Sequence, residues 1–110
     1  MIKVLFAKDP GGKYESVEID GHSGYAPSGR DIICAAVSAL AVNLVNSIET
    51  FTDDRMTEVD ADEDGGRICI RFGAPYGDRT ALLLDSFFLG LRSIADRYGD
   101  TYIRIIDRAE

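Results

Sequence analysis

Five short stretches of the chain carry the hydrophobic and polar pattern of β-strands. In residues 14–20, for example, Val17 and Ile19 alternate with polar residues, as in a strand with one face in a core and the other in water. The pattern predicts strands at residues 2–6, 14–20, 56–61, 67–72 and 101–107. Turn-forming residues at 9–12 and 62–66 join the first two strands and the middle two, so both pairs are predicted to be hairpins.

Two longer stretches have the three-and-four spacing of α-helices. The first follows Asp31, a good N-cap residue, and its hydrophobic stripe consists of Ile33, Val37, Leu40, Leu44, Ile48 and Phe51. The second starts at Asp78 as its capping residue and ends at Gly99, with a stripe at Leu84, Phe87, Phe88, Leu91, Ile94, Ala95 and Tyr98.

Strands and helices follow one another in the order β-β-α-β-β-α-β. This order predicts an α+β fold, a two-layer sandwich in which both helices lie on one face of a mainly antiparallel sheet. The length of 110 residues is sufficient for one hydrophobic core, so we predict a single domain over residues 1–110.

The first predicted helix is apolar on nearly every side. No charge occurs from position 32 to position 48, and Val42 and Val45 lie opposite the main stripe. A membrane span needs about 20 mostly apolar residues, and two asparagines in this shorter run argue against one. We therefore expect burial on two sides, by the sheet and by either the second helix or a second copy of the chain, and we predict a homodimer.

Charge and composition exclude several classes of function. The formal net charge of −7 would repel nucleic-acid phosphates, so we expect no direct nucleic-acid binding and consider a basic protein the better partner. The apolar run at positions 1–7 is too short for an export signal, and two cysteines in such a chain indicate reduced thiols in the cytoplasm. One histidine and two cysteines are too few for a structural zinc site, so we predict no metal and no other cofactor.

A glycine-rich stretch of about ten residues, 21–30, separates the second strand from the first helix. Such connections usually need about 2–6 residues, so a longer one is typical of a binding loop or lid. The only histidine, His22, stands near its start, and Cys34 stands at the third position of the helix that follows.

This pairing of His22 with Cys34 is suited to acyl transfer. Backbone N–H groups and the dipole at a helix start favour a thiolate and lower the pKa of a cysteine from about 8.5 toward neutrality. His22 would activate the thiol and protonate the leaving amine. The alternative for Cys34 is a small buried packing residue.

The run GHSGYAPSGRDIICAAVSAL resembles the signature of the bacterial ribosomal-processing cysteine proteases, the Prp family. The positions that match are Gly21, His22, Gly29, Asp31, Cys34, Ala35, Ala36 and Ser38. The resemblance implies a cysteine endopeptidase in which His22 and Cys34 are the catalytic pair. It also implies a substrate, the precursor of large-subunit ribosomal protein number twenty-seven, from which a short N-terminal extension is removed during ribosome assembly.

Further residues of this run have two possible roles each. Asp31 either orients His22 or only caps the helix, and we favour the cap. Ser38, one turn beyond Cys34, either lines the pocket or permits close packing. By analogy with the family, Tyr25 and the loop glycines, with Gly21 as a hinge, contact the substrate.

Two other classes of function remain open. In one, Cys34 is a redox-responsive thiol that needs a resolving partner. The second cysteine, Cys69, lies in a predicted strand and is expected to be a buried apolar residue. In the other, the protein is a dimeric peptide-binding module without catalysis.

Overall fold

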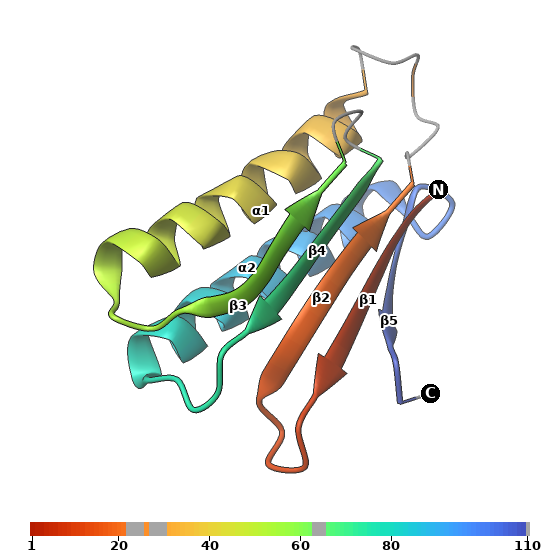
Figure 1. Ribbon diagram of the computed structural model, residues 1–110. Coiled ribbons are helices and arrows are strands. Elements are labelled where there is room, and N and C mark those ends of the chain that lie inside the picture. The colour runs from red at the N-terminus through yellow and green to blue at the C-terminus, as the bar shows by residue number, and fades with distance from the viewer. Residues whose placement is uncertain (22–25, 27–30, 63–65, 110) are drawn as a thin grey trace.

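The computed structural model describes residues 1–21, 26, 31–62 and 66–109. In chain order its elements are β1 (Ile2–Lys8), β2 (Tyr14–Asp20), α1 (Ile32–Phe51), β3 (Met56–Ala61), β4 (Arg67–Phe72), α2 (Asp78–Tyr98) and β5 (Ile103–Asp107). The five strands form one sheet in the order β3-β4-β2-β1-β5, and both helices cover the same face of it (Figure 1). The predicted α+β fold and its element order are therefore confirmed.

The sheet is mixed, with antiparallel pairing everywhere except at one edge. β1 pairs with β2, β2 with β4 and β3 with β4 in antiparallel fashion, whereas β5 runs parallel to β1. β5 begins at Ile103, two residues later than predicted. The reason is a turn after α2, in which the Tyr102 N–H donates to the Gly99 carbonyl at 3.2 Å.

The hydrophobic core fills the space between the sheet and the helix layer. Its fully buried side chains include Val4, Val17 and Ile70 from the strands, Ile33 and Ile48 from α1, and Leu84, Phe88 and Leu91 from α2. The two helices approach closely at Gly90, where an added Cβ would lie 3.0 Å from Leu40 Cδ1. The second side of α1 is thus covered by α2, one of the two partners expected from its sequence.

Not all of α1 is buried. By length and hydropathy this helix could span a membrane, but core helices of globular proteins have the same properties. Its buried residues pack into the core, whereas Val42 is 57% exposed. Phe51 was predicted to belong to the buried stripe; this is wrong, because α1 ends there and leaves the ring 61% exposed.

The start of α2 is anchored by a side chain from a distant segment. We expected Asp78 to be the N-cap, but the cap residue is Gly77 and Asp78 lies inside the first turn. The carboxylate of Asp54 accepts from the Gly77 N–H at 3.0 Å and from the Thr80 hydroxyl at 2.6 Å, and so ties the helix start to the segment before β3. The hydrogen bond from Thr80, and then that from Gly77, lowers the pKa of Asp54.

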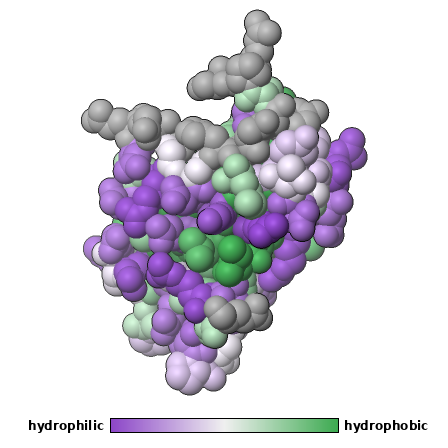
Figure 2. Space-filling model, turned by 90° about the vertical axis from the view of Figure 1, so that its right-hand side faces the viewer, coloured by the Kyte–Doolittle hydropathy of each residue, from purple (hydrophilic) through white to green (hydrophobic). Residues whose placement is uncertain are grey.

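At the β5 edge of the sheet, partly buried hydrophobic residues such as Ile94, Ala95 and Ile105 pack against the core. Figure 2 looks onto this side of the molecule and shows hydrophobic side chains gathered in the middle of a hydrophilic surround. The core therefore reaches the surface at this edge, because β5 has a strand neighbour on one side only.

Candidate active site

Cys34 is the third residue of α1, as predicted, and its side chain is partly buried. Asp31 precedes the helix in an extended conformation, with φ −80° and ψ 97°. Its Oδ1 accepts from the N–H of Ile33 at 3.1 Å and from the N–H of Cys34 at 3.0 Å. The predicted N-cap role of Asp31 is therefore confirmed, and it fixes where the helix, and with it Cys34, begins.

This cap uses backbone N–H groups at the helix start that could otherwise donate to a reaction intermediate. The N–H groups of Ile33 and Cys34 both donate to the Asp31 carboxylate, and that of Ala35 donates to the Asp31 carbonyl at 3.1 Å. These three donors are engaged within the cap, so they are not open to a developing oxyanion.

A small hollow lies beside Cys34. Its volume is about 20 Å³, and its lining comes from β1, β2, β4 and α1: Ile2, Ile19, Gly21, Cys34, Val37, Ser38 and Ile68. It brings together three of the predicted site residues, Gly21, Cys34 and Ser38. A cavity of this size has room for about one water molecule, so a substrate side chain must be held elsewhere.

The hollow also contains residues that no motif pointed to. Ile2 and Ile68 lie far from the glycine-rich run in sequence, and they reach Cys34 because of the order of the strands in the sheet. Two further predicted residues, His22 and Tyr25, lie outside the described residues. Their placement beside Cys34 remains a prediction.

Gly21, which directly precedes His22, is held tightly between two other segments. Its N–H donates to the Gly66 carbonyl at 2.8 Å, and its φ is +92°. A Cβ on this residue would lie 2.5 Å from the carbonyl oxygen of Met1. The structure thus gives Gly21 a packing role that fixes where the chain leaves β2, and the hinge role suggested by the sequence stays a prediction.

Cys69 is not the buried apolar residue that we expected. Ile68 and Ile70 of β4 face α1, so Cys69 between them faces the side of the sheet without helices, where it is partly exposed. Burial, followed by the nearby carboxylates of Glu58 and Glu18, raises the pKa of its thiol. Cys34 and Cys69 therefore lie on opposite faces of the sheet, and the redox alternative loses its resolving partner within the chain.

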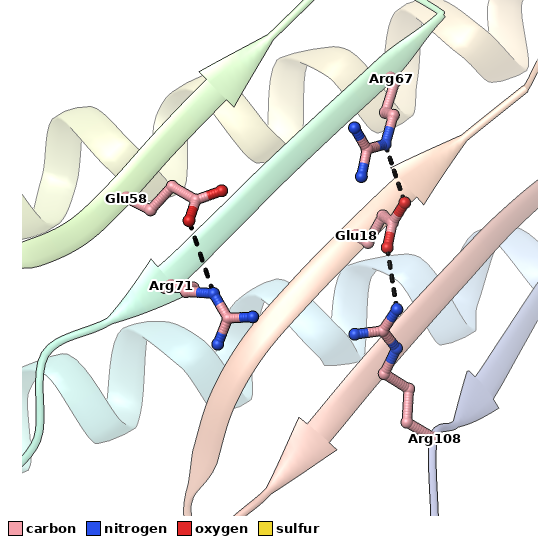
Figure 3. Close-up of polar contacts among 5 residues, drawn as sticks. All are labelled: Glu18, Glu58, Arg67, Arg71 and Arg108. Carbon is pink, nitrogen blue, oxygen red and sulfur yellow. Dashed lines mark hydrogen bonds and ion pairs between the residues drawn. The ribbon is translucent and has the colours of Figure 1, made fainter.

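Ion pairs organise the helix-free face around Cys69 (Figure 3). The carboxylate of Glu18 accepts from Arg67 Nε at 2.8 Å and from Arg108 Nη2 at 3.2 Å. Glu58 and Arg71 form a looser pair at 3.5 Å. Among residues 1–21, 26, 31–62 and 66–109, no three histidine, cysteine or acidic side chains are arranged to hold a metal ion.

Comparison with known families finds relatives that are described as cysteine proteases. Residues 1–104 match the family model described as Cysteine protease Prp. The ribosomal processing cysteine protease Prp of Staphylococcus aureus is 32% identical over 100 residues, which cover 91% of this chain and 93% of the relative. The protein of the same description from Bacillus subtilis is 28% identical over 89 residues, which cover 77% and 79% of the two chains.

The fold is similar to that of a solved protease structure. The crystal structure of the essential ribosomal processing protease Prp from Staphylococcus aureus, in complex with a covalently linked product peptide, superposes with a TM-score of 0.92 at 31% identity. The alignment covers 98% of this chain and all of the other. Similarity of this extent includes every described element, from β1 to β5.

Proposed function

The chain belongs to the cysteine protease Prp family and is a cysteine peptidase; on this premise we propose that it removes an N-terminal extension from a ribosomal protein precursor. The precursor that we propose is that of large-subunit ribosomal protein number twenty-seven, and the site of action is the cytoplasm, where ribosomes assemble. The observation that carries the proposal is the position of Cys34, capped at a helix start and beside a hollow, in a fold shared with ribosomal processing proteases.

In the proposed reaction, Cys34 and His22 form a catalytic dyad. His22 takes the proton of the thiol as the sulfur attacks the peptide carbonyl, and a new carbon–sulfur bond forms. The carbon–nitrogen bond then breaks, and His22 delivers the proton to the departing amine. Water hydrolyses the resulting thioester, which releases the acyl fragment as a carboxylic acid and restores the thiol.

The charge of the protein supports a basic protein substrate. At −7 the chain attracts the positively charged proteins that bind ribosomal RNA, and it repels the RNA itself. The proposed partner is therefore the free precursor before it enters the ribosome, without direct contact with nucleic acid.

Purified protein mixed with the precursor is expected to produce one shortened product. Mass spectrometry of that product should give a single new N-terminus, while a second basic ribosomal protein without an N-terminal extension stays intact under the same conditions. Intact precursor after prolonged incubation with folded protein would contradict the proposed function. Equal digestion of both proteins would contradict the proposed specificity.

We propose that the protein acts as a homodimer. Support comes from α2, on which Leu82 and Leu89 are seven residues apart on one face and are 69% and 64% exposed. Light scattering at micromolar concentration should give about twice the chain mass of 12.0 kDa, and the Leu82→Glu/Leu89→Glu double variant should give the mass of one chain. A wild-type mass of one chain would rule the dimer out.

A further inference from the structure

The chain at the start of β4 contacts both segments that carry the proposed dyad. The Gly66 carbonyl accepts from the N–H of Gly21, the residue before His22, at 2.8 Å. Two positions further along, the side chain of Ile68 lines the hollow beside Cys34. The same short stretch of chain therefore supports the end of β2 on one side and the start of α1 on the other.

Arg67 lies at the centre of this stretch and is held through its backbone and its side chain. Its carbonyl accepts from the Asp62 N–H at 2.9 Å, and its backbone lies opposite Asp20 of β2. Its side chain points to the helix-free face of the sheet, where Nε donates to Glu18 Oε1 at 2.8 Å (Figure 3). Because Gly66 is the next residue of the chain, a shift of Arg67 would move the Gly66 carbonyl as well.

The ion pair of Arg67 with Glu18 differs from an ordinary surface pair. Glu18 lies on β2, the middle strand of the sheet, and its side chain is only 16% exposed. Its second oxygen accepts from Arg108 Nη2 at 3.2 Å, so each carboxylate oxygen has its own guanidinium group. Isolated exposed pairs contribute little, because water and salt screen them. A shielded carboxylate on a rigid strand, with two charged donors, holds its partners in one geometry.

We propose that Arg67, held by Glu18, is a positioning residue for the proposed dyad. It keeps the chain before His22 at a fixed position relative to Cys34, and its effect passes through the backbone at Gly66. This inference rests on the proposed function, because it requires the dyad. Proton transfer from a thiol to an imidazole needs the two atoms within about 2.6–3.2 Å, so a small shift of either segment lowers the rate.

Arg67→Gln tests the proposal in steady-state cleavage of the precursor, below the unfolding temperature of each variant. We expect kcat to fall about tenfold while KM stays within about twofold, since dyad geometry acts on the transition state rather than on binding. A displacement of about 1 Å can cost about a hundredfold, but the hydrogen bond between Gly66 and Gly21 remains and limits the shift. Arg67→Lys keeps a positive charge beside Glu18 and should recover part of the rate.

Alkylation of Cys34 by iodoacetamide gives a second readout that needs no substrate. It is measured against pH in a Cys69→Ser background, so that only one thiol reacts. An imidazolium beside a thiolate keeps a cysteine reactive at lower pH. Among the described residues that line the hollow, only the thiol itself titrates, and Asp31 caps the helix in every variant. A higher pH of half-maximal alkylation in Arg67→Gln therefore reports a displaced histidine, whereas a purely structural role would lower the unfolding temperature and leave this pH unchanged.

Arg71→Gln is the matched control. It removes the same charge from the same face of β4, four residues and about 13 Å further from Gly66. Arg71 forms the looser pair with Glu58 at 3.5 Å, and both side chains are about half exposed. Both glutamine variants change the attraction of a basic substrate alike, so only Arg67→Gln should lower kcat and raise the pH of alkylation.

The remaining outcomes each decide the proposal. If Arg67→Gln matches Arg71→Gln in kcat and in alkylation, Arg67 does not position the dyad. Glu18→Gln leaves the arginine in place without its ion pair, so wild-type kcat in this variant would also overturn the inference. Should Arg67→Gln fail to fold, Arg67→Lys and Glu18→Gln carry the same test. If the wild type leaves the precursor intact, the proposed function fails, whereas the alkylation profiles still decide whether Arg67 positions the histidine.

Discussion

Replacement of Cys34 by serine is expected to reduce cleavage of the precursor by several orders of magnitude while the protein stays folded. A hydroxyl ionises far less readily than a thiol, so a histidine cannot activate it to the same degree. The cap explains why the fold should survive: Asp31 accepts from the backbone N–H of residue 34, which serine also has, so this cap hydrogen bond is retained. Initial rates with the precursor, together with thermal unfolding curves of both proteins, measure the two effects separately.

The second cysteine is a natural control for this experiment. Cys69→Ser alters the helix-free face of the sheet and should leave the cleavage rate within about twofold of wild type. Alkylation adds an independent test, because burial and two carboxylates raise the pKa of Cys69 and leave it little thiolate at neutral pH. Iodoacetamide should therefore label Cys34 before Cys69. A Cys34→Ser variant that cleaves at the wild-type rate would disprove the nucleophile assignment.

Gly21→Ala is expected to cost both stability and activity, and more of each than an alanine at another glycine with positive φ. An L-residue at φ +92° costs about 1–2 kcal/mol of backbone energy. The new Cβ would also lie 2.5 Å from the Met1 carbonyl oxygen, so the chain must move by about 1 Å at the residue that precedes His22. A misplacement of about 1 Å near reacting groups can reduce kcat/KM about a hundredfold.

Gly12→Ala separates the two causes. Gly12 has a similar φ of +83°, but an added Cβ there meets no atom within 4 Å. The Gly12→Ala variant should therefore lose only the stability that the positive φ costs. Its cleavage rate should stay close to that of the wild type when both variants are assayed below their unfolding temperatures. Equal stability and equal kcat/KM for the two variants would mean that the contact between Gly21 and Met1 does not position the site.

The elements of this protein and the start of α1 could be predicted from sequence, because the interactions that define them are local. Alternation in residues 14–20 gave both ends of β2 correctly. Asp31 caps α1 through N–H groups two and three residues further along the chain, a relation that residue type and spacing reveal. The same spacing placed Cys34 at the third helical position, and the pattern around it indicated the family.

What only the tertiary structure decided depends on segments that are distant in sequence. α2 begins after Gly77 rather than after Asp78, and Asp54 from the chain before β3 holds Gly77 and Thr80 at the helix start. Cys69 faces the side of the sheet without helices. Alternation within β4 separates Cys69 from Ile68 and Ile70, but only the position of the two helices decides which of these faces is buried. The contact of Gly21 with Met1 arises from the pairing of β1 with β2. Periodicity reports which residues of one element share a face, but it carries no information about which other element that face will meet.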